Sequence, residues 1–307
     1  MRQNRPVLGI VLMLGFCVLA PLSDALAKIL GARLGIGELV AWRFLAQTIL
    51  LAPIVLWLGQ ALWLPGRLMA IAVLRGALHV VGSFAMFLAL RHLPLVETVA
   101  IAYVMPFIAL MMGRCFLGEV VGPRRLSAAV AGFLGTLLVV QPTFAAVGWY
   151  ALLPLFVAVV FAAFMLTTRA VSHLVDPVRL QAVSGVASLV LCLPALAVGA
   201  ALGIPDLSLA GPGRDVLMLY LGLGVLGTLA HLFMVWSLKY AATATVAPMQ
   251  YLEIPVAALI GLWLFGAFPN GLALWGVAIT VASGLYVIWI EHAGARRALP
   301  RDGREGG

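Results

Sequence analysis

One acidic side chain lies in the middle of a long apolar stretch, Thr243 to Gly266. This residue, Glu253, comes about ten residues after the start of the stretch, and Gln250 precedes it by three positions. Because residues three apart share one face of a helix, the two side chains are predicted to point the same way. A carboxyl group at membrane depth is costly and needs a partner or a use. Glu253 could carry a proton or bind an ammonium group; the alternative is a neutral acid hydrogen-bonded to a neighbouring helix.

Two tyrosines occupy matching places in two apolar stretches. Tyr103 and Tyr251 each come about eight residues after the start of their stretch, and a proline follows each of them, Pro106 and Pro255. A phenol can stack on a solute or hydrogen-bond to it, and it can equally pack in a core with its hydroxyl satisfied. Proline frees backbone carbonyls and lets a helix bend, so both stretches are expected to bend near their tyrosines.

Two histidines also lie in corresponding stretches. His79 shares a predicted helical face with Arg75 and Ser83, and His231 lies three residues after Thr228. Because the unperturbed pKa of histidine lies near neutrality, either ring could relay a proton. The competing interpretation is an interhelical hydrogen bond that only stabilises the bundle.

Three charged residues lie close to the first predicted helical hairpin. Asp24 and Lys28 are spaced i,i+4 near the end of the first apolar stretch, and Arg43 lies at a similar depth in the second. An ion pair between Asp24 and Arg43 would neutralise both charges. We expect this structural pairing rather than direct contact with a solute.

The composition places all these residues in a membrane. Hydrophobic residues make up 64% of the 307 residues, charged residues only 10%, and the mean hydropathy is +1.13. A soluble domain is about half apolar and about one quarter charged. The chain is therefore predicted to be an all-α integral membrane protein, with the lipid bilayer as its surroundings.

Ten stretches are apolar enough to cross a bilayer as helices of roughly 20 residues. The breaks between them fall at glycines, prolines and charge clusters. The stretches are Val7 to Leu30, Glu38 to Leu58, Leu68 to Leu90, Leu95 to Leu117, Leu126 to Gln141, Trp149 to Ser172, Pro177 to Ala200, Val216 to Leu238, Thr243 to Gly266 and Gly271 to Glu291.

The distribution of positive charge predicts the orientation. Ten crossings put both termini on one side, and most Lys and Arg residues fall on or near that side: Arg2, Arg5, Arg67, Arg75, Arg114, Arg124, Arg125, Arg169, Arg179, Lys239, Arg296, Arg297, Arg301 and Arg304. Opposite them fall Lys28, Arg33, Arg91 and Arg214. The positive-inside rule then predicts that both termini are cytoplasmic in a bacterial-type inner membrane. The net charge of +8 is accounted for by this topology, so we expect no binding to nucleic acid.

The chain is predicted to contain an inverted repeat. Residues 1–145 and 146–292 each hold five predicted crossings, and residues 293–307 form a basic cytoplasmic tail. Since five is odd, the second half must cross the membrane in the opposite direction to the first. Inverted repeats place a binding site near the midplane between the halves, where rocking can expose it to each face in turn.

The chain resembles the drug/metabolite transporter superfamily, EamA-type branch, over nearly its full length. The motifs that carry the resemblance are Trp42-Arg43-Phe44, Leu93-Pro94-Leu95 through Pro106-Phe107, Gly118-Glu119, Tyr251-Leu252-Glu253-Ile254-Pro255, and Gly261 to Gly266. Ala267 departs from the pattern, because the second half of the family usually repeats the Gly-Glu of Gly118-Glu119. The resemblance implies a secondary transporter of a small metabolite, with export of an amino acid or related compound as the first expectation and uptake of a compound such as S-adenosylmethionine as the alternative.

Other functions are less well supported by the sequence. Gly222, Gly224 and Gly227 spell GxGxxG inside an apolar stretch with no strand before it, so helix packing is a better explanation than dinucleotide binding. Cys17, Cys115 and Cys192 are isolated, which supports neither a disulfide framework nor a zinc site. An intramembrane enzyme would need a nucleophile and base, or a metal cluster, in fixed geometry. We expect no cofactor and no metal; proton coupling and the oligomeric state stay open.

Overall fold

The fold is that of a computed structural model, which describes residues 5–298 except 119–120, 208–210, 212, 214–215 and 268–270. Glu119 therefore lies outside the described residues. The described part is mostly helical and contains no strand. Its elements are α1 (Pro6–Gly31), α2 (Ile36–Trp57), α3 (Gly66–His92), α4 (Leu95–Ala102), α5 (Met105–Leu117), α6 (Pro123–Val147), η1 (Gly148–Ala151), α7 (Leu152–Val171), α8 (Pro177–Ala201), η2 (Pro205–Leu207), α9 (Leu217–Tyr240), α10 (Thr243–Val246), η3 (Ala247–Leu252), α11 (Glu253–Phe265) and α12 (Gly271–Ala298).

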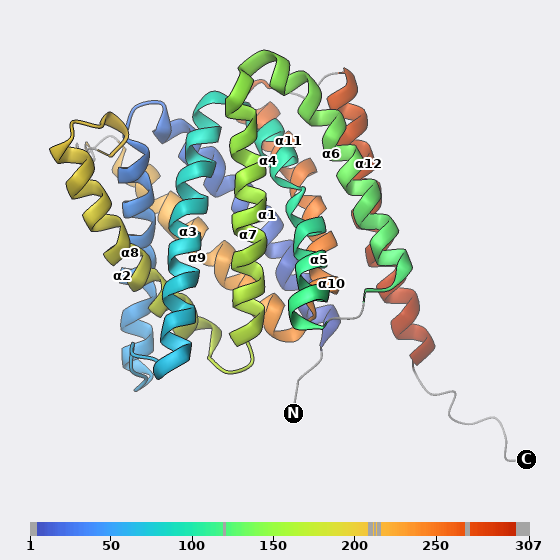
Figure 1. The fold of residues 1–307 in the computed structure, drawn as a ribbon, viewed down its shortest axis with the longest axis horizontal. Coiled ribbons are helices and arrows are strands. Elements are labelled where there is room, and N and C mark those ends of the chain that lie inside the picture. Colours follow the sequence, from blue (N-terminus) through green and yellow to red (C-terminus); the bar gives the residue numbers. More distant parts are fainter. Residues whose placement is uncertain are drawn as a thin grey trace, which may run out of the picture.

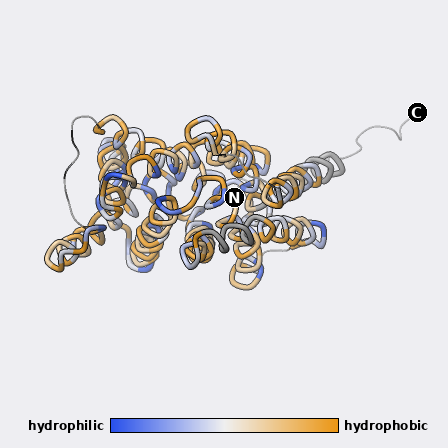
Figure 2. The backbone as a smooth tube through the Cα atoms, turned by 90° about the horizontal axis from the view of Figure 1, so that it is seen from above, coloured by the Kyte–Doolittle hydropathy of each residue, from blue (hydrophilic) through white to orange (hydrophobic). Residues whose placement is uncertain are grey.

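These elements make the ten predicted apolar crossings. Seven segments are long and apolar enough to cross a membrane, and three shorter apolar helices, Leu126–Leu138, Met249–Phe265 and Gly271–Tyr286, supply the others. The helices run side by side as one bundle (Figure 1), and most residues along them are hydrophobic (Figure 2). Large apolar side chains face outward, among them Trp57, Trp263 and Trp275, which are 86%, 81% and 69% exposed. Such a surface is suited to contact with lipid. The last helix continues to Ala298, past the predicted end of the tenth crossing.

The fourth and ninth crossings are both interrupted near their centres. In the fourth crossing, α4 ends at Ala102, and α5 begins at Met105 with a proline in its first turn. The ninth is divided into α10, the 3-10 segment η3 and α11, which also carries a proline in its first turn. Proline lacks the N–H that would continue the helical ladder, which explains why the helix restarts at these points. The bends that were expected at these prolines are therefore present, and they take the form of full interruptions of both crossings.

Both interrupted crossings end in the same way. Gly118 and Gly266 cap α5 and α11 with φ of 64° and 62°. This left-handed conformation costs little only for glycine. After the second cap the backbone N–H of Ala267 donates to the Gly261 carbonyl at 3.1 Å, so the alanine that departs from the family pattern still follows an equivalent turn.

Helix packing reflects the repeat. Exchanging the two halves maps the contact of α1 with α9 onto that of α3 with α7, and the contact of α2 with α9 onto that of α3 with α8. The contacts of α2 with α8 and of α6 with α12 map onto themselves. Helix α1 begins and α12 ends at the same edge of the bundle, here called the terminal edge, and α7 begins at the opposite, far edge (Figure 1). The two five-crossing halves therefore run in opposite directions.

At each edge of the bundle, a cation at the equivalent position of its half bridges two helix ends. At the far edge, Lys28 Nζ donates to the carbonyls of Leu90 and Leu93 at the end of α3, at 2.6 Å each. At the terminal edge, Arg169 donates to the carbonyl of Leu238 near the end of α9. A cation is favourable at a helix C-terminus because the last carbonyls lack partners within the helix. Arg91 also binds the Gly31 and Leu34 carbonyls and forms an ion pair with Asp206.

We expect Gly135→Ala to destabilise the fold. A Cβ atom built on Gly135 of α6 would lie 2.8 Å from the backbone oxygen of Gly276 in α12, so the two helices would have to separate. Overpacking of this kind costs about 1–3 kcal/mol. Thermal melts in detergent should show a lower melting temperature for Gly135→Ala and none of this loss for Gly122→Ala, whose Cβ would meet nothing within 4 Å. Equal melting temperatures for both variants would contradict this close packing of α6 and α12.

Candidate functional site

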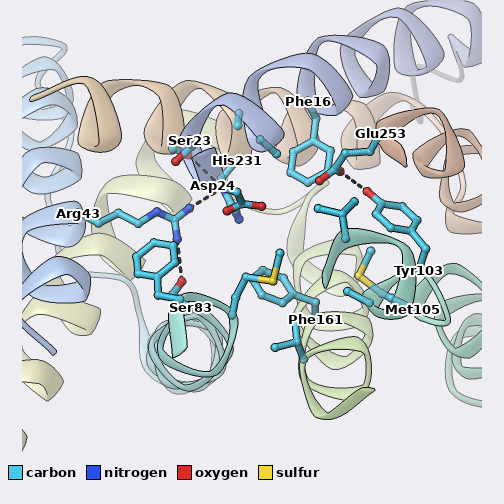
Figure 3. Close-up of a pocket in the computed structure, with 18 residues that line it drawn as sticks. Phe16, Ser23, Asp24, Arg43, Ser83, Tyr103, Met105, Phe161, His231 and Glu253 are labelled. Carbon is cyan, nitrogen blue, oxygen red and sulfur yellow. Dashed lines mark hydrogen bonds between the residues drawn. The ribbon is translucent and has the colours of Figure 1, made fainter. Parts of the chain in front are cut away.

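A cavity lies at the centre of the bundle, where the interrupted crossings meet α1, α2, α3, α7 and α9 (Figure 3). About 70 Å³ of it is open to the centres of water molecules. Since about 10–15 Å³ on this measure is the least that admits one water, the cavity has room for more than one water or for part of a compact solute. Its lining combines charged and polar groups with apolar walls: Phe16, Ala20, Ser23, Asp24, Arg43, Ser83, Met86, Phe87, Val99, Ala102, Tyr103, Met105, Val157, Phe161, Gly227, Ala230, His231 and Glu253.

One end of the cavity is built around the guanidinium of Arg43. Its Nη1 donates to Ser83 Oγ at 2.7 Å, and its Nη2 lies 2.9 Å from His231 Nδ1. The same Nδ1 lies 3.0 Å from the Gly227 carbonyl oxygen, so it accepts from the guanidinium in one tautomer of His231 and donates to the carbonyl in the other. Gly227 allows the close approach of α2 to α9, since a Cβ atom there would lie 2.7 Å from Arg43 Nε. Arg43 Nε itself has no partner among the described residues.

The predicted ion pair between Asp24 and Arg43 is not formed. Among the described residues, no hydrogen bond or ion pair joins the two side chains, although both line the cavity. Arg43 instead directs its two Nη groups to Ser83 and His231, which leaves the Asp24 carboxyl facing the cavity. Lys28 does not neutralise Asp24 either, because its ammonium group caps α3. The predicted direct ion pair is therefore not formed in this structure, but the two side chains are close enough for their charges to interact.

The other end of the cavity is acidic. Glu253 is the first residue of α11, and Tyr103 lies in the break between α4 and α5. The Tyr103 hydroxyl donates a hydrogen bond to Glu253 Oε2. The breaks of the two interrupted crossings thus place an acid and a phenol together. Figure 3 shows this pair across the cavity from Arg43.

Aromatic and thioether side chains form the walls between the two ends. Phe16 comes from α1, Met86 and Phe87 from α3, and Phe161 from α7. Phe161 reaches the cavity, while Phe164, Met165 and Thr168, which follow it on α7, are fully buried and do not line it.

Tyr251 and Gln250 lie behind the cavity rather than on its surface. The Tyr251 ring is fully buried 6.0 Å from the Tyr103 ring, and it occupies the space left by Gly132, whose Cβ would lie 2.5 Å from its Cζ. Gln250 is fully buried, and its side-chain nitrogen and oxygen have no partner among the described residues. The matched tyrosines of the repeat therefore have different surroundings in this conformation.

Arg75 and His79 form a second polar cluster next to the cavity. The His79 ring lies 4.3 Å from that of His231, and Arg75 binds Thr168 Oγ1 at 2.8 Å and Gln181 Oε1 at 2.7 Å. Gln47 joins the cluster by donating to the Gln181 carbonyl at 2.8 Å. Gln47 and Gln181 were not among the predicted site residues, although each is a polar side chain inside an apolar stretch.

Comparison with known proteins decides the family. Residues 7–141 match the EamA-like transporter family. A protein from Rhizobium johnstonii named "Riboflavin transporter" is 30% identical over 226 residues, which cover 73% of this chain and 71% of that protein. This chain belongs to the EamA-like transporter family. The resemblance to the drug/metabolite transporter superfamily is thereby confirmed.

Further similarities agree with membership of the EamA-like family. A protein from Rickettsia felis named "S-adenosylmethionine uptake transporter" is 24% identical over 275 residues, 90% of each chain. A solved crystal structure superposes with a TM-score of 0.69 at 19% identity, over 98% of this chain and 100% of its own, which shows a shared fold. The family and the relatives' names identify this EamA-like protein as a small-molecule transporter and not an enzyme.

We expect a bulky side chain in the cavity to stop transport without unfolding the protein. Ala230 of α9 lines the cavity, and its neighbour Leu229 points outward with 40% exposure. Ala230→Phe should occupy most of the roughly 70 Å³, whereas Leu229→Phe adds its ring to the outer surface. Solute flux in proteoliposomes should fall to background for the first variant alone, with both variants eluting as folded protein in size-exclusion chromatography. Normal flux through folded Ala230→Phe would show that the solute does not pass through this cavity.

Proposed function

We propose that this EamA-like protein is a secondary transporter of a solute with an amino-acid head group, and that it exports an amino acid or a related compound. The proposal rests on one observation: the cavity presents Arg43 at one end and the carboxyl groups of Asp24 and Glu253 elsewhere on its wall. A carboxylate would bind the Arg43 guanidinium, and an ammonium group would bind the acids. Charge-assisted hydrogen bonds of this kind are about twice as strong as neutral ones.

The apolar wall suits the remainder of such a solute. Phe87, Phe161 and Met86 provide aromatic and thioether surface between the polar ends. Apolar pockets with a few placed polar groups are the usual form of small-molecule sites, in which the polar groups fix the orientation of the ligand. We propose that the head group is recognised at the polar ends and that the side chain of the solute contacts this wall.

Movement of the two halves would expose the cavity to each side in turn. We propose that residues 1–145 and 146–292 act as the two inverted units, which rock about the interrupted crossings. The breaks at Tyr103 and in η3 support this proposal, because discontinuous helices at a repeat interface are typical of transporter binding sites. The hydrogen bonds of Lys28 at the far edge and of Arg169 at the terminal edge would have to break alternately. We further propose an inner-membrane location with both termini cytoplasmic, which the excess of arginine at the terminal edge supports.

Uptake of S-adenosylmethionine is the second candidate. The Rickettsia felis relative carries that name, and S-adenosylmethionine contains the same carboxylate and ammonium groups as an amino acid. Its sulfonium cation would meet the aromatic walls favourably. The two candidates therefore share the head-group site and differ in the size of the solute and in direction.

Counterflow in proteoliposomes tests the proposal. Vesicles loaded with each unlabelled solute of a panel receive the labelled form outside, and the panel contains the common amino acids, S-adenosylmethionine and riboflavin. We expect transient accumulation of label above equilibrium for one or more compounds with an amino-acid head group. Accumulation of riboflavin alone would refute the amino-acid proposal while retaining a transporter.

A further inference from the structure

Arg75 is a buried cation without an acidic partner in the described part of the chain. The side chain is fully buried, and its hydrogen bonds go to a hydroxyl, Thr168, and an amide oxygen, Gln181. Its guanidinium carbon also lies 4.3 Å from the centre of the Phe164 ring. All three partners are neutral. A buried charge without a counter-charge costs several kcal/mol, so its presence calls for a use.

Unpaired polar atoms gather around this guanidinium. Arg75 Nη1, Gln181 Nε2, Ser184 Oγ and both ring nitrogens of His79 are buried and have no partner among the described residues. Native interiors leave few buried polar atoms unpaired, and each calls for an explanation. Nη1 and Nε2 can only donate, Ser184 Oγ and the His79 ring can each donate or accept, and Gln47 Oε1, which is also buried without a partner among the described residues, can only accept. Since no acidic side chain among the described residues balances the Arg75 charge, an anionic oxygen group is the ligand that would pair with this guanidinium.

The cluster lies between the cavity and the terminal edge. Arg75 precedes the cavity residue Ser83 by eight positions on α3, or about 12 Å at 1.5 Å per residue. Since α3 begins at the terminal edge, Arg75 is displaced toward that edge (Figure 1). The His79 ring connects the cluster to the cavity, because it touches both His231 and Phe161 on the cavity wall.

We propose that Arg75, with Gln181 and Ser184, forms a second binding station for the anionic group of the solute. The station rests on the proposed function, since it takes over the carboxylate that Arg43 holds in the central cavity. Helices α3 and α8 pack closely at this point, because a Cβ atom on Gly76 would lie 3.0 Å from the backbone carbonyl oxygen of Ser184. Opening of the terminal side would separate the two helices there. The solute would then pass along the donors of Arg75, Gln181 and Ser184. Its anionic group would be paired with Arg43 in the cavity and with Arg75 at the station.

Cysteine labelling tests the station without a known solute. In a background with Cys17, Cys115 and Cys192 changed to alanine, Ser184→Cys reports on the station and Ala102→Cys on the cavity. Purified protein in proteoliposomes is treated, from the side that carries the termini, with an anionic or a cationic methanethiosulfonate reagent. At each position, the reaction rate of the anionic reagent is divided by that of the cationic reagent. This quotient is then divided by the same quotient for free cysteine, which gives the corrected ratio. We expect both positions to react, and the corrected ratio at Ser184→Cys to favour the anionic reagent by about tenfold.

Arg75 variants show whether this preference depends on the guanidinium. Arg75→Gln should bring the corrected ratio at Ser184→Cys close to one, and Arg75→Lys should retain part of the preference. Acetate should slow the anionic reagent at this position. Slowing by chloride and not by acetate would overturn the assignment to a carboxylate.

Three other outcomes would overturn the station. They are failure of Ser184→Cys to react while Ala102→Cys reacts, failure of both to react from the terminal side, and equal reaction of both reagents at Ser184→Cys. The comparison of Ser184→Cys with Ala102→Cys keeps Arg75 intact, so it stands even if Arg75→Gln does not fold. Labelling requires no transported compound, so these outcomes are independent of failure in the counterflow panel.

Discussion

Replacing Arg43 by glutamine should weaken binding of a carboxylate-bearing solute by about 30-fold or more. Arg43 is the cation that lines the cavity, and its Nε has no partner among the described residues. Removing one partner of a buried, hydrogen-bonded charge pair costs about 2–5 kcal/mol. The measurement is the KM of counterflow, or the Kd from equilibrium binding, for the best amino acid of the panel and for its carboxamide.

The carboxamide is the control that separates recognition from folding. It lacks the negative charge, so Arg43→Gln should change its already weak binding little. Arg43→Lys keeps the charge but not the fork that reaches Ser83 and His231, and we expect an intermediate loss. If Arg43→Gln weakens the amino acid and its amide equally, Arg43 supports the fold and does not hold the carboxylate.

Replacing Glu253 by glutamine should reduce net, gradient-driven transport by about tenfold or more while solute exchange survives better. Glutamine keeps the shape of the side chain and an oxygen that can accept from Tyr103, but it cannot carry a proton. If a proton must bind and leave at Glu253 in each cycle, the loss falls on the net step alone. The comparison of net flux with exchange, each measured across a range of pH, checks this result. The pH dependence of net flux should flatten.

Other results would assign Glu253 a different role. Joint loss of binding, exchange and net flux would place the ammonium group of the solute on Glu253, with no proton carried there. Normal activity of Glu253→Gln in both assays at every pH would make the residue structural. Tyr103→Phe is the matched variant, because it removes the hydrogen bond to Glu253 but leaves the carboxyl group.

The helical framework could be predicted from sequence because it depends on local properties. A run of apolar residues specifies a crossing whatever its neighbours are, and proline interrupts a helix by removing a backbone donor. The ten crossings and the bending of two of them therefore followed from the chain alone. Glu253, His231, Arg43 and Tyr103 could be selected as candidates for the same reason, since a polar residue at membrane depth is costly wherever it lies.

The partners of these residues could not be predicted, because they depend on which helices meet. Asp24 and Arg43 are close along the hairpin, yet Arg43 turns to Ser83 on α3 and His231 on α9. Tyr103 and Tyr251 are equivalent in the repeat, but only Tyr103 lines the cavity, since Tyr251 packs into the space at Gly132. Gln181 gave too weak a signal alone, and its importance became visible only beside Arg75.

Recognition of an amino-acid head group at both ends of the cavity can be measured directly with the wild-type protein. Counterflow of one amino acid, its carboxamide and its N-acetyl derivative is compared in the same proteoliposomes. We expect rapid counterflow of the amino acid and a loss of about tenfold or more for each derivative, because each removes one of the two charges that the cavity pairs. Equal counterflow of all three compounds, or counterflow of uncharged solutes only, would contradict it.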